Sequence, residues 1–414
     1  MIFFILAVYV VAYLYIIFKS ETASITTFIF GLLSVLLLGA FDFESVSKIV
    51  DFNTLFILIG MMIMVSVLKR RGVFSEISRI LIKMSKGNFL VLTMLIYIGI
   101  FFLSAFLDNV TTIIIFVPIL FYTAESLELD PKPLLTNAIL FSNLGGMTTA
   151  IGDPPNIVIY SVSKLSFISF ITHLMPPGIL IMLFQLYFLG KNVRYPRTGI
   201  GINIEASKRS ENQKWLYYFI AFTGVVLFMA FHEALGLELG VISIIYAFTI
   251  LFVEDMNIHS IGDDIEWDSI FLISGLYLLN YSIEQINITK PLLAVLSPLA
   301  NSVFLPLFIL WSSMFVSGFL SALPVTLLYL SLIKTLIRLG AGNELYWALA
   351  LGIGVGGNLT PISSMCNIVG NNLFRNMKNE TLSFKEFTKR MLKPVLSGGI
   401  ISSVFLIVFW WFGI

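Results

Sequence analysis

The chain has few charged residues, one cysteine and three histidines. Charged residues make up 12% of its 414 residues, against about 25% in a soluble protein, and 58% are hydrophobic. The lone Cys366 excludes a disulfide framework and a cysteine-built metal site, and His173, His232 and His259 are isolated. The net charge of +1 gives no indication of a nucleic-acid partner. We therefore expect a membrane protein with no metal site and no cofactor.

Apolar segments long enough to cross a bilayer as helices occur along the whole chain. Eight are uninterrupted: 1–18, 24–41, 53–68, 168–190, 214–231, 235–253, 268–285 and 391–414. Four more contain polar residues or proline: 88–124, 133–163, 302–338 and 345–375. The first segment has no basic leader and no small-residue cleavage site, so we expect a first span rather than a signal peptide. The pattern predicts an all-α polytopic membrane protein.

The two halves of the chain repeat one another. The motif Gly-Gly-x-x-Thr-x-Ile-x-x-x-x-Asn-Ile-Val begins at Gly145 and again at Gly356, 211 residues later. The string DFNTLFILIGM from Asp51 also resembles EWDSIFLISGL from Glu266. Matches at nearly constant spacing indicate an internal duplication. We predict one repeat over 1–200 and a second over 201–414.

Basic residues indicate that the two repeats insert in opposite directions. The connection 69–86 contains six Lys and Arg residues, whereas its counterpart at about 286–302 contains one. By the positive-inside rule the first is cytoplasmic and the second external. The basic connections 191–214 and 375–393 also fit the cytoplasm, which places both termini outside and makes the repeats inverted. The loop 254–268 should be cytoplasmic but contains acids and no Lys or Arg, so it supports neither side.

The interrupted segments contain the candidate binding residues. Pro154-Pro155 prevents a continuous helix, and backbone groups freed at membrane depth must be shielded by protein or face a wet cavity. Paired broken helices in inverted repeats are typical of secondary transporters. The candidate ion- and substrate-binding residues are Asp108, Asn109, Thr111, Thr112, Asn143, Gly145, Gly146, Thr149, Asp153, Asn156, Thr326, Gly356, Gly357, Asn358, Thr360, Ser363, Ser364 and Asn367.

Three strings resemble a known family: FLSAFLDNVTTIIIFVP, NLGGMTTAIGDPPNIVIYS and GGNLTPISSMCNIV. They are similar to the ion transporter superfamily, in particular its ArsB and P-protein branch, and more distantly to NhaD-type sodium/proton antiporters and dicarboxylate symporters. The resemblance implies an elevator-like transporter in which each inverted repeat has about five transmembrane helices, one re-entrant hairpin and one broken helix. The hairpins would be 88–124 and 302–338, and the broken helices 133–163 and 345–375. Asp108 and Asn109 match the first hairpin tip, while the second tip has Pro324, Val325 and Thr326 and no asparagine.

We expect a gradient-coupled secondary transporter, most similar to a permease that exports arsenite or a related oxyanion. Asp108 and Asp153 would handle a coupling proton or sodium ion, and Asn109, Thr149, Asn156, Thr360 and Asn367 would form the polar site. Neither broken motif contains Lys or Arg, which suits arsenite because arsenite is largely neutral near neutral pH. Sodium/proton antiport would use the same two acids, and dicarboxylate or citrate symport is a further alternative. The expected setting is the plasma membrane, with a homodimer implied by resemblance alone.

Other interpretations of these residues stay open or fit less well. The glycine pairs could serve helix packing, and Cys366 could be a small packing residue instead of a ligand. Asp108 and Asp153 could lie in surface loops, or form the dyad of an intramembrane aspartyl protease, but an inverted duplication has no role in a protease. His232-Glu233 lacks the further histidine of a zincin. We expect no enzymatic activity, and dependence of flux on an ion gradient would separate a carrier from a channel.

Overall fold

The computed structural model describes residues 2–18, 22–39, 42–192, 214–286 and 290–412, and every regular element in these ranges is helical. The first half contains α1 (Ile2–Phe18), α2 (Ala23–Leu37), α3 (Phe43–Ile49), α4 (Phe52–Arg70), α5 (Val73–Met84), α6 (Phe89–Ser104), α7 (Asn109–Ser126), α8 (Pro131–Gly146), α9 (Pro154–Ser163) and α10 (Phe167–Asn192). The second half contains α11 (Trp215–Ala230), α12 (His232–Leu235), α13 (Leu239–Val253), α14 (Ile258–Ile261), η3 (Gly262–Asp264), α15 (Trp267–Gln285), α16 (Lys290–Leu296), η4 (Ser297–Leu299), α17 (Phe304–Phe319), α18 (Ala322–Arg338), α19 (Glu344–Gly356), α20 (Met365–Lys378) and α21 (Phe384–Phe412). The predicted boundary at 200/201 lies outside the described residues.

All eight uninterrupted segments form helices, and each interrupted segment forms two helices separated by a break. By length and hydropathy, four described helices could cross a membrane unaided: Phe52–Arg70, Asn109–Ser126, Phe167–Gly190 and Phe384–Phe412. A fifth span results if Leu239–Val253 and Ile258–Asp264, between which the chain bends by 113°, count as one span. The other apolar helices are shorter, and those of the interrupted segments are short because half-helices end at membrane depth.

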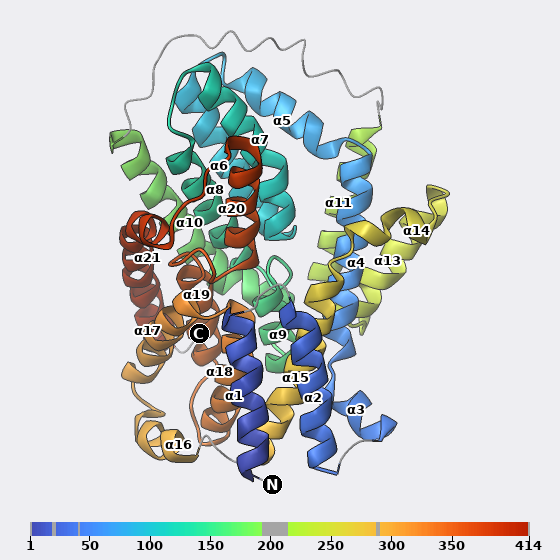
Figure 1. Cartoon of the computed structure of the whole chain (residues 1–414), viewed down its shortest axis with the longest axis vertical. Coiled ribbons are helices and arrows are strands. Elements are labelled where there is room, and N and C mark those ends of the chain that lie inside the picture. Colours follow the sequence, from blue (N-terminus) through green and yellow to red (C-terminus); the bar gives the residue numbers. More distant parts are fainter. Residues whose placement is uncertain (1, 19–21, 40–41, 193–213, 287–289, 413–414) are drawn as a thin grey trace.

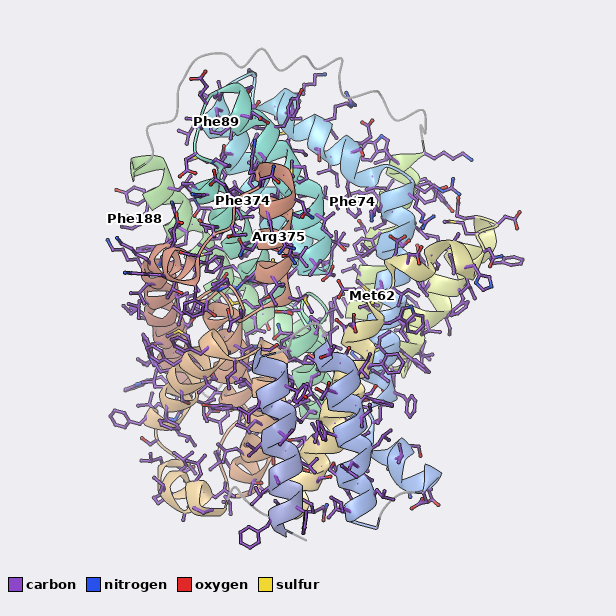
Figure 2. All side chains as sticks on the ribbon, in the orientation of Figure 1. Met62, Phe74, Phe89, Phe188, Phe374 and Arg375 are labelled. Atoms are coloured by element: carbon purple, nitrogen blue, oxygen red, sulfur yellow. The ribbon has the colours of Figure 1, made fainter. Side chains whose placement is uncertain are left out.

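The helices form two groups (Figure 1). The scaffold helices are α1, α2, α4, α11, α13 and α15, in which α2 packs closely on α15 and α4 on α13. The core helices are α6 to α10 and α17 to α21, in which α17 packs on α19, and α8 on both α6 and α7. Side chains fill the core (Figure 2): Phe374 of α20 packs edge-on against Phe121 of α7, with ring centroids 5.6 Å apart. Helices of both repeats therefore share one apolar core.

Hydrogen bonds of the scaffold recur at corresponding positions of the two repeats. The backbone N–H of Gly240 in α13 donates to Oδ1 of Asn53 in α4 at 2.8 Å, and the hydroxyl of Ser24 in α2 donates to the carboxylate of Asp268 in α15. These contacts join corresponding positions of the two repeats, because Asn53 and Asp268 are 215 residues apart and Ser24 and Gly240 are 216 apart. In Figure 1, α4 leads to α5 at the top, whereas α15 leads to α16 at the bottom. The repeats are therefore inverted, as predicted.

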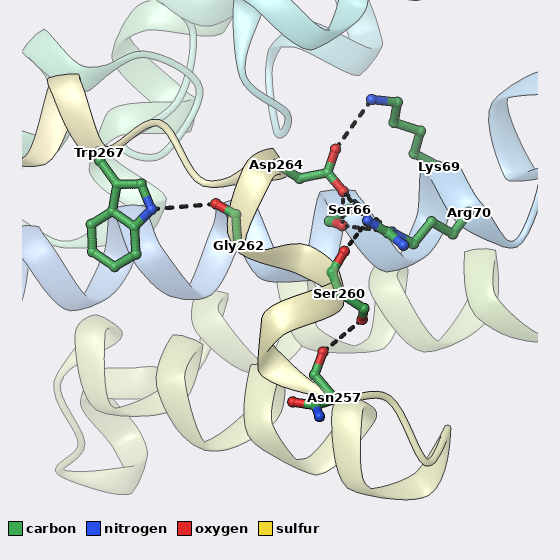
Figure 3. A network of polar contacts seen from close by, with 8 residues as sticks. All are labelled: Ser66, Lys69, Arg70, Asn257, Ser260, Gly262, Asp264 and Trp267. Atoms are coloured by element: carbon green, nitrogen blue, oxygen red, sulfur yellow. Dashed lines mark hydrogen bonds and ion pairs between the residues drawn. The ribbon is translucent and has the colours of Figure 1, made fainter.

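The acidic loop that fitted neither side of the membrane pairs with the basic end of α4 (Figure 3). The carboxylate of Asp264 accepts from the Ser66 hydroxyl at 2.6 Å, and it forms ion pairs with Lys69 at 3.3 Å and Arg70 at 2.8 Å. Partial burial alone would raise the pKa of Asp264, but the Ser66 and Arg70 bonds and the Lys69 charge outweigh it and hold that pKa below its ordinary value of 3.8. Basic residues of α4 thus neutralise an acid of this loop, although the loop itself has no Lys or Arg.

No ion pair between described residues joins a core helix to a scaffold helix. In the core, Lys378 pairs with Glu125 at 3.0 Å and Lys132 with Glu380 at 3.1 Å. Contacts across the boundary between the groups include neutral hydrogen bonds: the Tyr13 hydroxyl in α1 donates to the carbonyl of Pro324 in α18 at 3.1 Å. On α9, the Tyr160 hydroxyl lies 3.1 Å from Nε2 of His232, and the Ser161 hydroxyl donates to Asp51 before α4. Few polar contacts therefore hold core and scaffold together.

Candidate functional site

A cavity of about 270 Å³ lies where the scaffold meets the core. Both hairpin tips and the second halves of both broken helices border it, together with α1, α2 and the start of α15. In Figure 1 the α6–α7 hairpin lies in the upper half of the molecule and the α17–α18 hairpin in the lower half. The two hairpin tips therefore reach the cavity from opposite sides. The polar lining residues are Ser24, Asp108, Asn109, Asp153, Glu266, Asp268, Ser269, Ser321, Ser364 and Cys366.

Four of these lining residues are acids, and no Lys, Arg or His is among the described residues of the lining. Asp108 and Asp153 are the acids that the sequence predicts, whereas Glu266 and Asp268 are additional. A signal for them was present: Glu266 matches Asp51 in the repeat, and Asp268 stands where the first half has Asn53. No three His, Cys, Asp or Glu side chains of the described residues are grouped closely enough to hold a metal ion.

Asp108 and Asp153 both precede a helix, but their carboxylates are held differently. Asp108 caps α7, because it accepts from the backbone N–H groups of Val110 at 3.1 Å and Thr111 at 2.7 Å. These bonds and the positive end of the helix stabilise its charge. Asp153 makes no capping hydrogen bond to α9, whose first residues Pro154 and Pro155 have no N–H to donate. The Asp153 carboxylate is therefore the freer of the two to bind an ion.

Ser364 occupies the place of Asp153 in the second repeat. It precedes α20 with φ −141° and ψ 147°, close to the −145° and 138° of Asp153, and neither side chain caps its helix. The Ser364 hydroxyl donates to Oδ1 of Asn143 at 3.3 Å. The two halves therefore build the same turn, but only the first half places a charge there.

Four buried asparagines join the two repeats. Nδ2 of Asn143 in α8 donates to Oδ1 of Asn358 and of Asn367, both at 3.0 Å. Oδ1 of Asn143 accepts from Nδ2 of Asn109 at 3.4 Å. Each of the four is at most 4% exposed. The network connects the first hairpin tip to the second broken helix, and Oδ1 of Asn109 has no partner within the described part of the chain.

Asn156 and Asn367 bridge the unwound segments of the broken helices. Nδ2 of Asn156 donates to two carbonyls of the preceding turn at 2.9 and 2.8 Å, and Nδ2 of Asn367 does so at 2.8 and 2.8 Å. These bonds pair carbonyls that the helix breaks leave free. The Thr149 hydroxyl donates to the carbonyl of Ala105 at the first hairpin tip, while the Thr360 hydroxyl has no partner among the described residues.

Other predicted hydroxyls bond within the core. Thr112 lies 2.6 Å from the Ser104 hydroxyl, which lies 2.9 Å from that of Ser142, so the three tie the first hairpin to α8. Ser363 donates to the carbonyl of Gly357 at 2.7 Å, and Thr326 to a carbonyl of its own helix at 2.8 Å. These side chains determine how the helices around the cavity are placed.

The first glycine of each pair allows two helices to approach closely. A Cβ on Gly145 would overlap the backbone of Phe101 in α6, and one on Gly356 would overlap the backbone of Met314 in α17. Gly146 packs against the side chain of Asn109. Among the predicted residues, Asp108, Asn109, Asp153 and Ser364 line the cavity, and the others are not among its lining residues.

An acid-lined cavity between inverted repeats fits a transporter, and comparison with known proteins gives the family. The citrate transporter family matches residues 13–352, which is most of the chain. The chain belongs to the citrate transporter family. This confirms the resemblance to the ion transporter superfamily and identifies this citrate transporter family member as a multi-pass membrane transporter.

Relatives and a solved structure agree with this assignment. An uncharacterized transporter of Mycobacterium tuberculosis is 28% identical over 359 residues, 82% of this chain and 82% of that protein. The human P protein is 40% identical over 116 residues, which are 28% of this chain and 14% of that protein. The crystal structure of the Alcanivorax borkumensis YdaH transporter matches with a TM-score of 0.61 at 17% identity, over 87% of this chain and 86% of that one. The latter likeness concerns the fold alone.

Proposed function

We propose that this citrate transporter family member is a gradient-coupled secondary transporter in which a proton or sodium ion binds at Asp153, beside Asp108. One observation supports this most strongly: the cavity contains four carboxylates and no basic side chain among its described lining residues. Carboxylates inside a membrane are costly unless they bind protons or cations. The position of the cavity suits alternating access, in which the core helices slide along the scaffold and carry the site across the membrane.

The cargo proposed first is arsenite or a related oxyanion in its neutral form, moved outward. An acid-lined cavity repels a bare anion, whereas a neutral oxyacid can hydrogen-bond to Asn109, Ser321 and Ser364. Cys366 is the chain's one cysteine, so tight thiolate capture is not available. Weak binding by hydroxyl and amide groups suits a carrier, because a carrier must release its cargo.

Two other cargoes have specific support. Family membership favours citrate, and in this cavity citrate would need a bound divalent cation to offset its negative charge. The acid-only lining favours sodium/proton antiport, in which the carboxylates exchange the two cations and no further cargo moves.

Flux into vesicles that contain the purified protein tests the proposal. We expect a pH gradient to drive arsenite uptake, the Cys366→Ser variant to retain it, and Asp153→Asn to abolish it. Asp263→Asn is the matched control, because Asp263 is an exposed acid outside the cavity. Sodium that dissipates the pH gradient without arsenite movement would identify an antiporter, and citrate uptake that requires a divalent cation would identify citrate symport.

The same proposal includes the setting of the protein. We place it in the plasma membrane with both termini outside, on the basis of the basic connection 69–86 and its weakly charged counterpart. A homodimer is proposed from the resemblance to elevator-like transporters.

A further inference from the structure

The last core helix, α21, consists of a charged part followed by an uncharged part. It lies at the outer edge of the molecule in Figure 1 and packs on α10, α17 and α19. Residues 394–412 contain no charged side chain. At roughly 1.5 Å per residue this part is about 28 Å long, which matches a hydrocarbon core of about 30 Å. Residues 384–393, where the charges are, therefore lie at the level of the lipid headgroups.

Three lysines form a row along the charged part. Lys385, Lys389 and Lys393 follow at intervals of four residues, which places them on one side of the helix. All three are exposed, and none forms an ion pair with another described residue, because Glu386 pairs with Arg390 instead, at 3.0 Å. Like charges at this spacing repel one another, and Lys385 also lies in the first turn, at the positive end of the helix. An anion beside the row would remove both costs.

The exposed face of α21 changes character after the lysines. Ile400, Val404 and Trp411 continue the same side of the helix at helical spacing, and each is more than half exposed. A small soluble anion would use the lysines alone and leave the apolar stripe without a partner. An anionic phospholipid fits both parts, because its headgroup carries the negative charge and its acyl chains are apolar.

We propose that this face of α21 binds an anionic phospholipid, with the phosphate beside Lys385, Lys389 and Lys393 and the acyl chains along the apolar stripe. In the proposed orientation the connection 375–393 is cytoplasmic, so the row faces the leaflet surface that is the more negatively charged. The inference goes beyond the proposed function and depends neither on the cargo nor on the coupling ion.

Melting of the purified full-length protein in a neutral detergent tests the proposal, because a ligand that binds the folded state raises the melting temperature. Phosphatidylglycerol is titrated in parallel with phosphatidylcholine of the same acyl chains and with inorganic phosphate. We expect phosphatidylglycerol alone to stabilise the wild type. The variant Lys385→Gln/Lys389→Gln/Lys393→Gln should need at least tenfold more phosphatidylglycerol for half of the effect, since each lysine beside an anionic lipid surface contributes about fivefold.

The matched control removes the same charge elsewhere. Lys83, Lys86 and Lys214 are exposed and belong to the other connections predicted to be cytoplasmic, and their joint replacement by glutamine should leave the titration nearly unchanged. Arginine at the three α21 positions keeps the charge and should keep the response, which separates a loss of binding from a loss of folding. An unchanged response in the α21 glutamine variant, or an equal loss in the control, would overturn the proposal. Equal stabilisation by phosphatidylcholine or by inorganic phosphate would do the same.

Discussion

Asn143 of the first repeat donates to Oδ1 of Asn367 in the second repeat at 3.0 Å. The direction of this bond is determined by Asn367, because its Nδ2 already donates to two carbonyls of the unwound segment. Asn358 is constrained in the same way, since its Nδ2 donates to two carbonyls of the preceding helix α19. One orientation of the Asn143 amide satisfies both acceptors, so this side chain holds the two halves of the core in register.

The first prediction concerns this residue. Asn143→Leu should lower the free energy of unfolding by several kcal/mol, at about 1–3 kcal/mol for each buried polar group left without a partner. Thermal unfolding of the purified protein in detergent measures the effect. Asn343→Ala is the control, because Asn343 is exposed and makes no capping hydrogen bond. Equal melting temperatures for the two variants would contradict the role of the network.

The two predicted acids should respond differently to neutralisation. Asp153→Asn should leave thermal stability nearly unchanged, because Asp153 makes no capping bond, and should abolish gradient-driven flux. Asp108→Asn should cost roughly 0.5–1 kcal/mol, because asparagine still caps α7 but lacks the charge that the helix N-terminus favours. Calorimetry and vesicle flux on the same preparations test this pair. Normal flux in Asp153→Asn would refute its assignment to the coupling ion.

Close packing at the first glycine of each pair predicts a large effect of one methyl group. Gly145→Ala and Gly356→Ala should each destabilise the protein by about 1–3 kcal/mol or more, because the new Cβ meets helix backbone that cannot move aside. Gly224→Ala in α11 should be neutral or stabilising, because its Cβ would enter open space. Melting temperatures of the three variants decide the matter, and a harmless Gly145→Ala would show that α6 and α8 are not held at this distance.

The proposed orientation can be tested with cysteines on a Cys366→Ser background. Ser75 in α5 and Asn301 after η4 are exposed and lie on opposite ends of the molecule in Figure 1, where α5 is at the top and α16 at the bottom. A membrane-impermeant reagent should label Asn301→Cys from outside intact cells and Ser75→Cys only after the cells are opened. Cells that carry Cys366→Ser alone give the background. Labelling of both from one side would rule out the inverted insertion.

The pairing of Asp264 predicts a pH-dependent contribution to stability. Its pKa is below 3.8 in the folded protein, so the group stabilises the fold above that pH, and the contribution is lost as the pH falls through the lowered value. Asp264→Asn should therefore melt below the wild type at neutral pH, and the difference should shrink below pH 3.8. Asp263→Asn serves as the comparison. A difference that stays constant down to pH 3 would mean that the charge of Asp264 contributes nothing.

The helices and their breaks could be predicted from the sequence because their causes are local. Apolar length determines the spans. Pro154-Pro155 forms the first turn of α9, where proline is tolerated, although the similar pair Pro176-Pro177 lies inside the continuous helix α10. The inverted repeat was also predictable, since matched motifs and unequal basic connections are both visible in one dimension. Asp108 and Asp153 stand out for the same reason, as acids within apolar sequence.

The rest of the site depends on contacts between distant segments. Glu266 and Asp268 look like ordinary acids at a helix start, and only the packing of α15 against α2 and α18 brings them to the cavity. Asn143 bonds to partners that are more than 200 residues away in the sequence. Nothing near Asn143 in the sequence therefore predicts that it, and not Asn109, connects the two repeats. The position of Asp264 in loop 254–268 is likewise explained only by the fold, which brings it to Lys69 and Arg70 at the end of α4.

The ion pairs of the core move with the core, and those of the scaffold stay with the scaffold. A relative slide therefore breaks neutral hydrogen bonds such as that of Tyr13 with the Pro324 carbonyl, but none of the ion pairs between described residues. Salt screens exposed ion pairs and leaves neutral bonds largely unaffected. Higher ionic strength should consequently weaken the ion pairs within the core and within the scaffold while leaving the neutral hydrogen bonds between them almost unchanged, so that salt affects the stability of each group more than these contacts between the groups.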